Sequence, residues 1–173
     1  EIFRGCSSLK NITVPEGVTK LPAYAFKGAK NLETVTLPST MTTIGASAFS
    51  GCTGLEQIKL PEGLTIIGQS AFSGCTGFTD VELPDSVTSI GYRAFADCTN
   101  LTTIWMNPEV ETTTECCIIL PKNLETVGKG IVARCTSLTG AVVHLPQNMG
   151  LITKEVLLGV TGDDGANITG IVG

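Results

Sequence analysis

One spacing recurs along the chain: the same residue types return every 23 positions. Prolines, phenylalanines and cysteines all keep this step. The members are Pro15, Pro38, Pro61 and Pro84; Phe3, Phe26, Phe49, Phe72 and Phe95; and Cys6, Cys52, Cys75 and Cys98. Because several residue types hold one spacing, the chain is built from copies of one short unit. A unit this short cannot bury an apolar face alone, so its copies must stack on one another.

Each unit predicts two short extended segments and a tight turn. Residues 34–37 alternate polar and apolar side chains, which is the pattern of a strand that buries one face. Pro38 lacks an N–H and ends that strand. Residues 41–45 are typical of a second extended segment, and residues 46–52 of a short α or 3₁₀ turn.

The spacing Leu-x-x-Leu-x-Leu, seen in Leu32, Val35 and Leu37, predicts a leucine-rich-repeat solenoid when it recurs in units of this length. The first extended segments would form a parallel β-sheet on one face. The second segments and the helical turns would form the other face, giving an α/β-type right-handed superhelix with a 23-residue repeat. The phenylalanines would stack as one column inside.

The full unit reads Leu-x-x-Ile-x-Leu-Pro-x-x-Leu-x-x-Ile-Gly-x-x-Ala-Phe-x-Gly-Cys-Thr. It resembles the BspA-like class of leucine-rich repeats over residues 1–106, most closely in Leu60-Pro61, Ile67-Gly68, Ala71-Phe72 and Gly74-Cys75. The resemblance implies a surface or secreted protein of bacteria or protozoa that takes part in adhesion to host proteins and other cells. It implies no catalytic residues.

The second half of the chain departs from the pattern. Asn107 stands where the next proline is expected, and the frame returns, shifted by 14 residues, at Pro121 and Cys135. We interpret the chain as a single solenoid fragment of a longer protein. It would hold regular repeats in 1–106, an inserted surface loop at 107–117 and degenerate repeats in 118–173.

The amino-acid composition argues against several classes of function. Lys and Arg number 11 against 16 Asp and Glu, a net charge of −5 that argues against a nucleic-acid partner. No apolar run approaches the roughly 20 residues that span a bilayer. With one histidine and no cofactor motif, the sequence predicts no enzyme, no cofactor and no metal site. The fragment lacks a signal peptide, but the resemblance implies an extracellular or cell-surface protein.

The seven cysteines allow two interpretations. Those in the repeated slot, such as Cys52 and Cys75, would be free thiols that act as small apolar core residues. A disulfide from Cys116 or Cys117 to Cys135 is the alternative that the spacing leaves open. Free thiols would also suit a reducing compartment.

The outward row of the predicted main sheet changes along the solenoid. Its first positions are small threonines, and its later ones carry large or charged side chains. The candidate binding residues are Lys59, Glu82, Trp105, Ile119, Val142 and His144. A tryptophan beside apolar neighbours on an exposed sheet favours a contact patch. The alternative is that the insertion folds over Trp105 and Ile119 and buries them.

These patterns predict a non-catalytic binding or adhesion module whose sheet face contacts another macromolecule, with a host-matrix or cell-surface protein as the favoured class. The alternative is a structural spacer domain of a larger surface protein. An enzyme is disfavoured because His144 has no nucleophile or carboxylate partner that the sequence can name.

Overall fold

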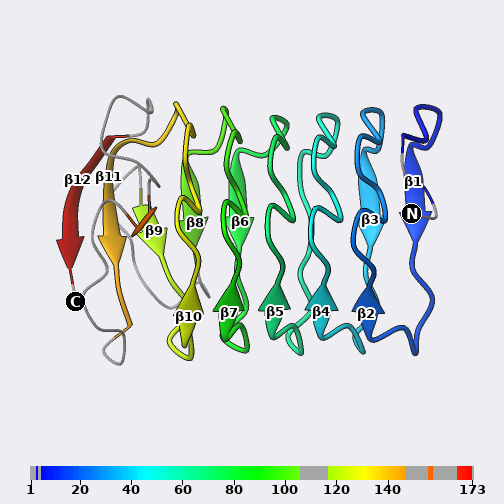
Figure 1. The fold of residues 1–173 in the computed structure, drawn as a ribbon, viewed down its shortest axis with the longest axis horizontal. Helices are drawn as coiled ribbons and strands as arrows, with labels where there is room; N and C mark the ends of the chain where they lie inside the picture. The colour runs from blue at the N-terminus through cyan, green and yellow to red at the C-terminus, as the bar shows by residue number, and fades with distance from the viewer. Residues whose placement is uncertain (1–2, 4, 106–116, 147–155, 158–166, 173) are drawn as a thin grey trace.

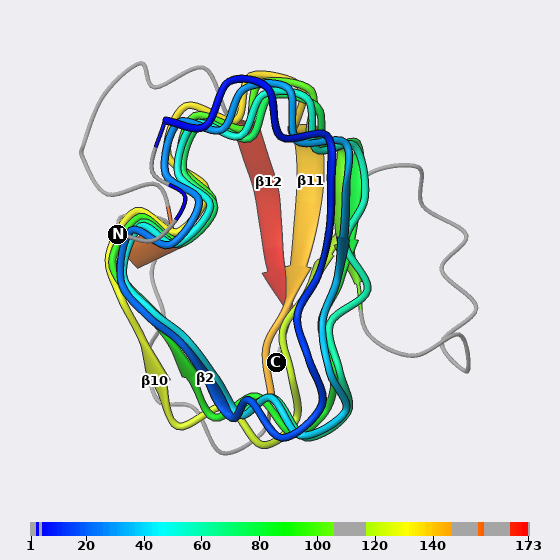
Figure 2. The same ribbon diagram turned by 90° about the vertical axis from the view of Figure 1, so that its right-hand side faces the viewer.

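The chain winds into a stack of coils, shown from the side in Figure 1 and along the stack in Figure 2. The structure is a computed structural model that describes residues 3, 5–105, 117–146, 156–157 and 167–172. The strands are β1 (Asn11–Thr13), β2 (Lys20–Leu21), β3 (Thr34–Thr36), β4 (Thr43–Ile44), β5 (Ile66–Ile67), β6 (Asp80–Glu82), β7 (Ser89–Ile90), β8 (Thr103–Trp105), β9 (Cys117–Ile119), β10 (Thr126–Val127), β11 (Thr139–His144) and β12 (Asn167–Val172). The predicted parallel β-solenoid with one coil per 23-residue unit is confirmed.

The second extended segments form one continuous sheet, which we call the back sheet. Its order is β2-β4-β5-β7-β10, and every pair is parallel. The register advances by one repeat at each step, so Ile44 lies opposite Ile67 and Ile67 opposite Ile90. Threonine side chains form further hydrogen bonds between neighbouring coils. The hydroxyl of Thr65, for example, donates to the carbonyl of Thr42 at 3.0 Å. All five strands of this sheet are therefore held to their neighbours.

The first extended segments, which we call the front strands, form two separate sheets. β1 pairs with β3, and a five-stranded sheet runs in the order β6-β8-β9-β11-β12. The coil between β3 and β6 contributes β5 to the back sheet but no strand to the front. Figure 1 shows the arrows of β3 and β6 standing apart on either side of it. The uninterrupted main sheet that the repeat predicts is thus broken at one coil.

The core is a column of phenylalanine rings that runs along the stack. Neighbouring ring centroids lie 5.3–5.4 Å apart, and the rings are nearly parallel. Phe49, Phe72 and Phe95 are fully buried. The predicted column is confirmed, and it joins the front strands to the back sheet through shared side-chain contacts.

The turn that the sequence predicts to be helical at residues 46–52 is not a helix. Ser47 and Gly51 have φ values of 53° and 74°, and left-handed residues interrupt a right-handed helix. Alternate residues instead donate within the coil and to the next coil. The N–H of Ala48 bonds Gly45 at 3.2 Å, while that of Phe49 bonds Ala71 at 2.8 Å. The turn therefore extends the cross-coil bonding, and the helical part of the predicted fold class is not confirmed.

A glycine follows four of the five back strands, all except β2, and close approach of the coils requires it there. A Cβ on Gly91 would lie 2.4 Å from the backbone N of Gln69 and 2.6 Å from the carbonyl carbon of Gly68. Contacts under 3.0 Å to backbone atoms force the coils apart. The Ile-Gly pair of the repeat is thus explained by the spacing of the coils.

Strand pairing resumes after the predicted insertion, because Ile104 of β8 lies opposite Ile118 of β9. Cys117, the last residue assigned to the insertion from the sequence, is the first residue of β9. Residues 107–116 lie outside the described residues.

Candidate binding surface

The structure places most of the predicted binding residues in one row at the ends of the front strands. Glu82 of β6 lies opposite Trp105 of β8, and Ile119 of β9 lies opposite His144 of β11. Val142 lies two residues before His144 on the same strand. The parallel register therefore brings residues from distant parts of the chain side by side.

The candidate binding residues differ in how far their side chains are exposed to solvent. Lys59 and Glu82 are exposed, and Val142 and His144 are half-buried. Ile119 is only 7 % exposed, so it offers little contact area. Residues 107–116, which the alternative prediction places over Ile119, lie outside the described residues. The side chain of Trp105 lies outside the described residues.

The surface also contains a feature that the sequence pattern does not predict. Residues 56–60, which we call the unpaired segment, cross the front face between β3 and β6. Within the described residues, their backbone forms no hydrogen bond with either neighbouring coil. β3 and β6 are consequently edge strands that face this segment. Unpaired strand edges are ready templates for another extended chain.

Two clefts flank the unpaired segment. The first, the β3 cleft, has a volume of about 570 Å³ and lies between β3 and Lys59. The second, the β6 cleft, has a volume of about 400 Å³ and is lined by Gln57, Ile58, Lys59, Asp80 and Glu82. Both volumes fall within the roughly 300–1,000 Å³ that is typical of ligand pockets.

The break in the front face coincides with one exceptional core residue. Phe78 occupies a repeat slot that is otherwise leucine, as at Leu55 and Leu101. It is fully buried, and its ring tilts by 50° against Phe72 at 5.7 Å instead of stacking. A larger side chain in a filled core displaces its surroundings. We expect this extra volume to hold the front strands apart here, and a Phe78→Leu variant tests that expectation.

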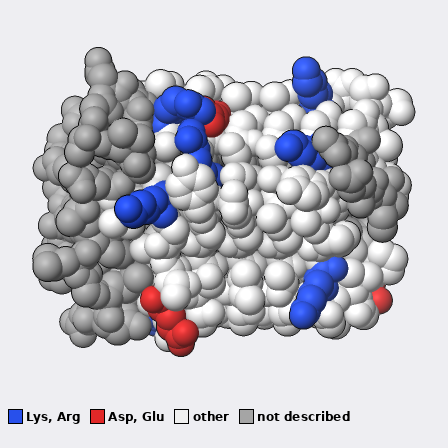
Figure 3. Space-filling view, viewed as in Figure 1, with Lys and Arg blue, Asp and Glu red and all other residues white. Residues whose placement is uncertain are grey.

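Charged groups on the front face are partly paired. Lys10 contacts Glu33 at 3.1 Å. In the β6 cleft, Asp80 accepts a hydrogen bond from the Thr79 hydroxyl at 3.0 Å, and Glu82 has no ion-pair partner among the described residues. Figure 3 shows the opposite face of the stack, over the back sheet, where two basic groups lie together beside an acidic group and the others stand apart.

The cysteines of the repeat slot are free thiols, as predicted, and all of them are buried except Cys6, which is half-buried. The Sγ atoms of Cys52, Cys75 and Cys135 each donate to a phenylalanine carbonyl at 3.1 Å. Burial raises the pKa of Cys52 and of Cys135 from 9.0 to about 12. Because Cys135 is free and inside the core, the alternative disulfide to Cys116 or Cys117 is not formed.

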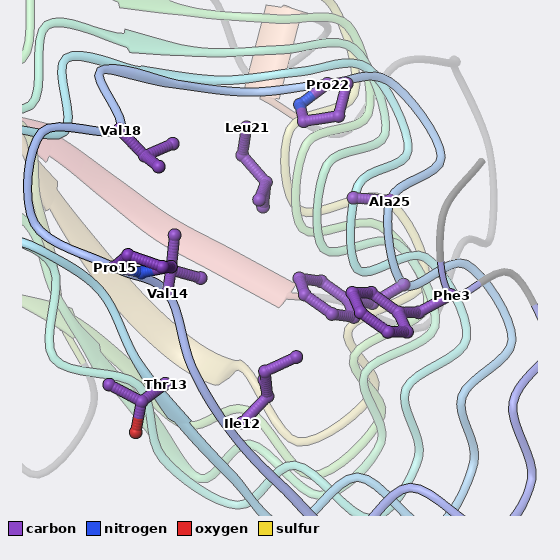
Figure 4. A pocket seen from close by; sticks show the side chains of 10 residues that line it. Phe3, Ile12, Thr13, Val14, Pro15, Val18, Leu21, Pro22 and Ala25 are labelled. Atoms are coloured by element: carbon purple, nitrogen blue, oxygen red, sulfur yellow. The ribbon is translucent and has the colours of Figure 1, made fainter.

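Other features of the described region offer less for binding. An apolar hollow of about 270 Å³ lies in the first coil, between Phe3, Ile12 and Leu21 (Figure 4). The large exposed apolar side chains Tyr24, Ile66 and Tyr92 belong to three different coils. Within the described residues, no group of acidic, cysteine and histidine side chains could hold a metal ion, and no helix is long and apolar enough to cross a membrane.

Comparison with known proteins identifies the repeat. A model of the BspA type leucine rich repeat region matches residues 1–118 in six copies. A leucine-rich repeat protein from Bacteroides ovatus is 33 % identical with a TM-score of 0.69; the match covers 85 % of this chain but only 34 % of that one. The Treponema pallidum (T. pallidum) leucine-rich repeat protein is 25 % identical with a TM-score of 0.75, over 95 % of this chain and 69 % of that one.

A third solved structure, the pneumococcal vaccine antigen PcpA, shares the fold at 20 % identity and a TM-score of 0.62. That match covers 95 % of this chain and 41 % of the antigen. No curated protein sequence matches the chain.

Proposed function

Because the chain belongs to the BspA-type leucine-rich-repeat family, we propose that it is a non-catalytic binding or adhesion module that presents its front strands to a protein partner. The observation that carries this proposal is the row of Glu82, Trp105 and His144 along strand ends held in register. A repeat stack offers a long, preorganised surface of this kind. Preorganisation lowers the entropy that binding costs.

The proposed location is the cell surface or the extracellular space. The family resemblance supports it, and a vaccine antigen is among the proteins that share the fold. The proposed partner is accordingly a protein of the host matrix or of another cell surface.

A structural spacer is the second candidate. The continuous back sheet and the stacked phenylalanine column would make a stiff rod, which could hold other domains apart. A spacer requires the core but not the exposed row, so the two candidates differ in what surface substitutions do.

The test is saturable binding to immobilised extracellular-matrix and cell-surface proteins, with Trp105→Ala and His144→Ala beside the parent chain. We expect both variants to bind more weakly with unchanged circular dichroism. Glu125→Gln, an exposed substitution beside β10 of the back sheet, is the matched control and should bind normally. Binding that is equal in all four proteins would place the site elsewhere, and the absence of binding by the parent would favour the spacer.

A further inference from the structure

The edge of β6 that faces the unpaired segment is the strongest unassigned feature of the molecule. β6 pairs with β8 on one side only. On its other side, residues 56–60 form no backbone hydrogen bond with it. The edge therefore carries backbone donors and acceptors that the fold leaves unused, next to a cleft of about 400 Å³.

An edge beside a cleft suits one class of occupant. An extended chain satisfies strand-edge donors and acceptors along its whole length, whereas a compact ligand meets one or two of them. Addition of a strand to an exposed edge is a recurring mode of peptide recognition, in which backbone bonds give affinity and alternate side chains give specificity.

The charges of the cleft select among extended chains. Asp80 and Glu82 lie two residues apart on β6 and therefore point to the same side of the strand. Lys59 is the one basic residue that lines the cleft, so the lining carries a net negative charge. Ile58, half-buried between them, supplies an apolar contact. Basic side chains at alternate positions of a peptide would meet the two carboxylates.

We propose that the β6 cleft binds an extended segment of a partner protein, with basic residues at alternate positions, by adding it as a strand to the free edge of β6. This inference rests on the proposed binding function and names its partner class. The unpaired segment forms the opposite wall of the cleft.

The experiment measures binding of a fluorescein-labelled peptide, acetyl-Thr-Lys-Val-Lys-Val-Lys-Val-amide, by fluorescence anisotropy. A second peptide carries N-methyl groups on alternate backbone amides and keeps every charge. We expect saturable binding of the first and an affinity at least about 10-fold weaker for the second, because it lacks the donors that a strand needs. A third peptide with Glu in place of Lys should bind more weakly still.

Two variants locate the site. Asp80→Asn combined with Glu82→Gln should weaken binding of the lysine peptide by about 5-fold or more, in the range expected for loss of close charge pairs. Glu125→Gln, exposed and next to the back sheet, should leave it unchanged. Hydrogen exchange should slow at residues 56–60 and 80–82 when the lysine peptide is bound.

Equal binding of the methylated peptide would overturn strand addition, and equal binding by the Asp80→Asn, Glu82→Gln variant would overturn the assigned cleft. Absence of binding by every peptide would overturn the proposal as a whole. The parent chain is also tested on the matrix proteins. If it binds them while it binds no peptide, the general binding function stands and only this inference fails.

Discussion

The back sheet and the front strands are built from the same repeat, yet only the back sheet is continuous. In the back sheet each strand finds its neighbour, and threonine hydroxyls bond from coil to coil. On the front, the backbone of residues 56–60 is bonded to neither side. The difference shows that the repeat length sets which residues meet but does not by itself ensure that their backbones pair.

Glycines lie at the close contacts of the paired back sheet, and a phenylalanine lies in the core near the unpaired front segment. Gly68 and Gly91 permit the back of each coil to approach the preceding one, because any Cβ there would overlap backbone atoms. Phe78 fills the leucine slot behind the front face and is fully buried. The coils also approach closely at Gly77, just before Phe78, where a Cβ would lie 2.7 Å from the Leu55 carbonyl oxygen, so the loss of pairing is confined to residues 56–60.

Loss of a ring from the shared column should disturb both faces and give the largest effect. Phe72→Ala removes a fully buried ring that stacks on Phe49 and Phe95 at 5.3 Å. We expect the free energy of unfolding to fall by about 3–5 kcal/mol, measured by urea denaturation. Thr36→Ala, on an exposed position, should change it by less than about 0.5 kcal/mol. Similar losses in the two variants would contradict the register.

A methyl group at a glycine next to the back sheet should destabilise the contact between neighbouring coils at that sheet. Gly91→Ala places a Cβ 2.4 Å from the backbone of Gln69, and we expect a loss of about 1–3 kcal/mol in the free energy of unfolding. The matched control is Gly63→Ala, whose Cβ would lie 3.6 Å from its nearest neighbour. That variant should stay within about 1 kcal/mol of the parent. A control as damaged as Gly91→Ala would mean that close approach is not the cause.

A smaller side chain at position 78 should allow the front strands to pair as continuously as those of the back sheet. In Phe78→Leu the slot regains its usual residue, and the unpaired segment should move toward β3 and β6. We expect amide hydrogen exchange at residues 56–60 to slow by roughly 10-fold, the effect of about one added hydrogen bond. Phe95→Leu is the comparison, since it changes the column but not this slot. Unchanged exchange in Phe78→Leu would show that the break has another cause.

The thiol column should give the smallest effect and a pH dependence of known sign. The folded state raises the pKa of Cys52 from 9.0 to about 12, chiefly through burial, and so favours the protonated thiol. Stability from this group is complete below pH 9 and is lost as pH rises from 9 toward 12. Urea denaturation between pH 8 and 11 should show this decline. The decline should be smaller in Cys52→Ala, a substitution that Ala29 already makes in the same slot. An equal decline in both would assign it to other groups.

Much of the fold could be predicted from the sequence because the repeat encodes it position by position. The phenylalanine column, the buried cysteine slot and the parallel register all follow from residues that return at one spacing. The turns could not be predicted as well. Residues 46–52 contain small residues that a helix accepts, and the left-handed φ values of Ser47 and Gly51 distinguish the turn from a helix.

The candidate binding surface was less predictable for a related reason. Alternation along one strand suggested that Ile119 faces outward, but exposure depends on what covers a position, which alternation does not encode. Likewise, nothing in residues 56–60 marks them as unpaired, because their pattern matches that of β3. The one unusual residue nearby is Phe78, which replaces the leucine of this repeat slot. The replacement keeps the position apolar, but it adds volume in the core between neighbouring coils.

The buried thiols also limit what cysteine content says about the environment of a protein. Oxidation and disulfide exchange both require a thiolate that reagents can reach. Cys75 and Cys98 fail both conditions, since they are fully buried and burial raises the pKa of each. Such thiols survive in an oxidising compartment as they do in a reducing one. In a solenoid of this kind, the many unpaired cysteines therefore reflect a small, buried repeat position. They do not indicate whether the protein works in a reducing or an oxidising compartment.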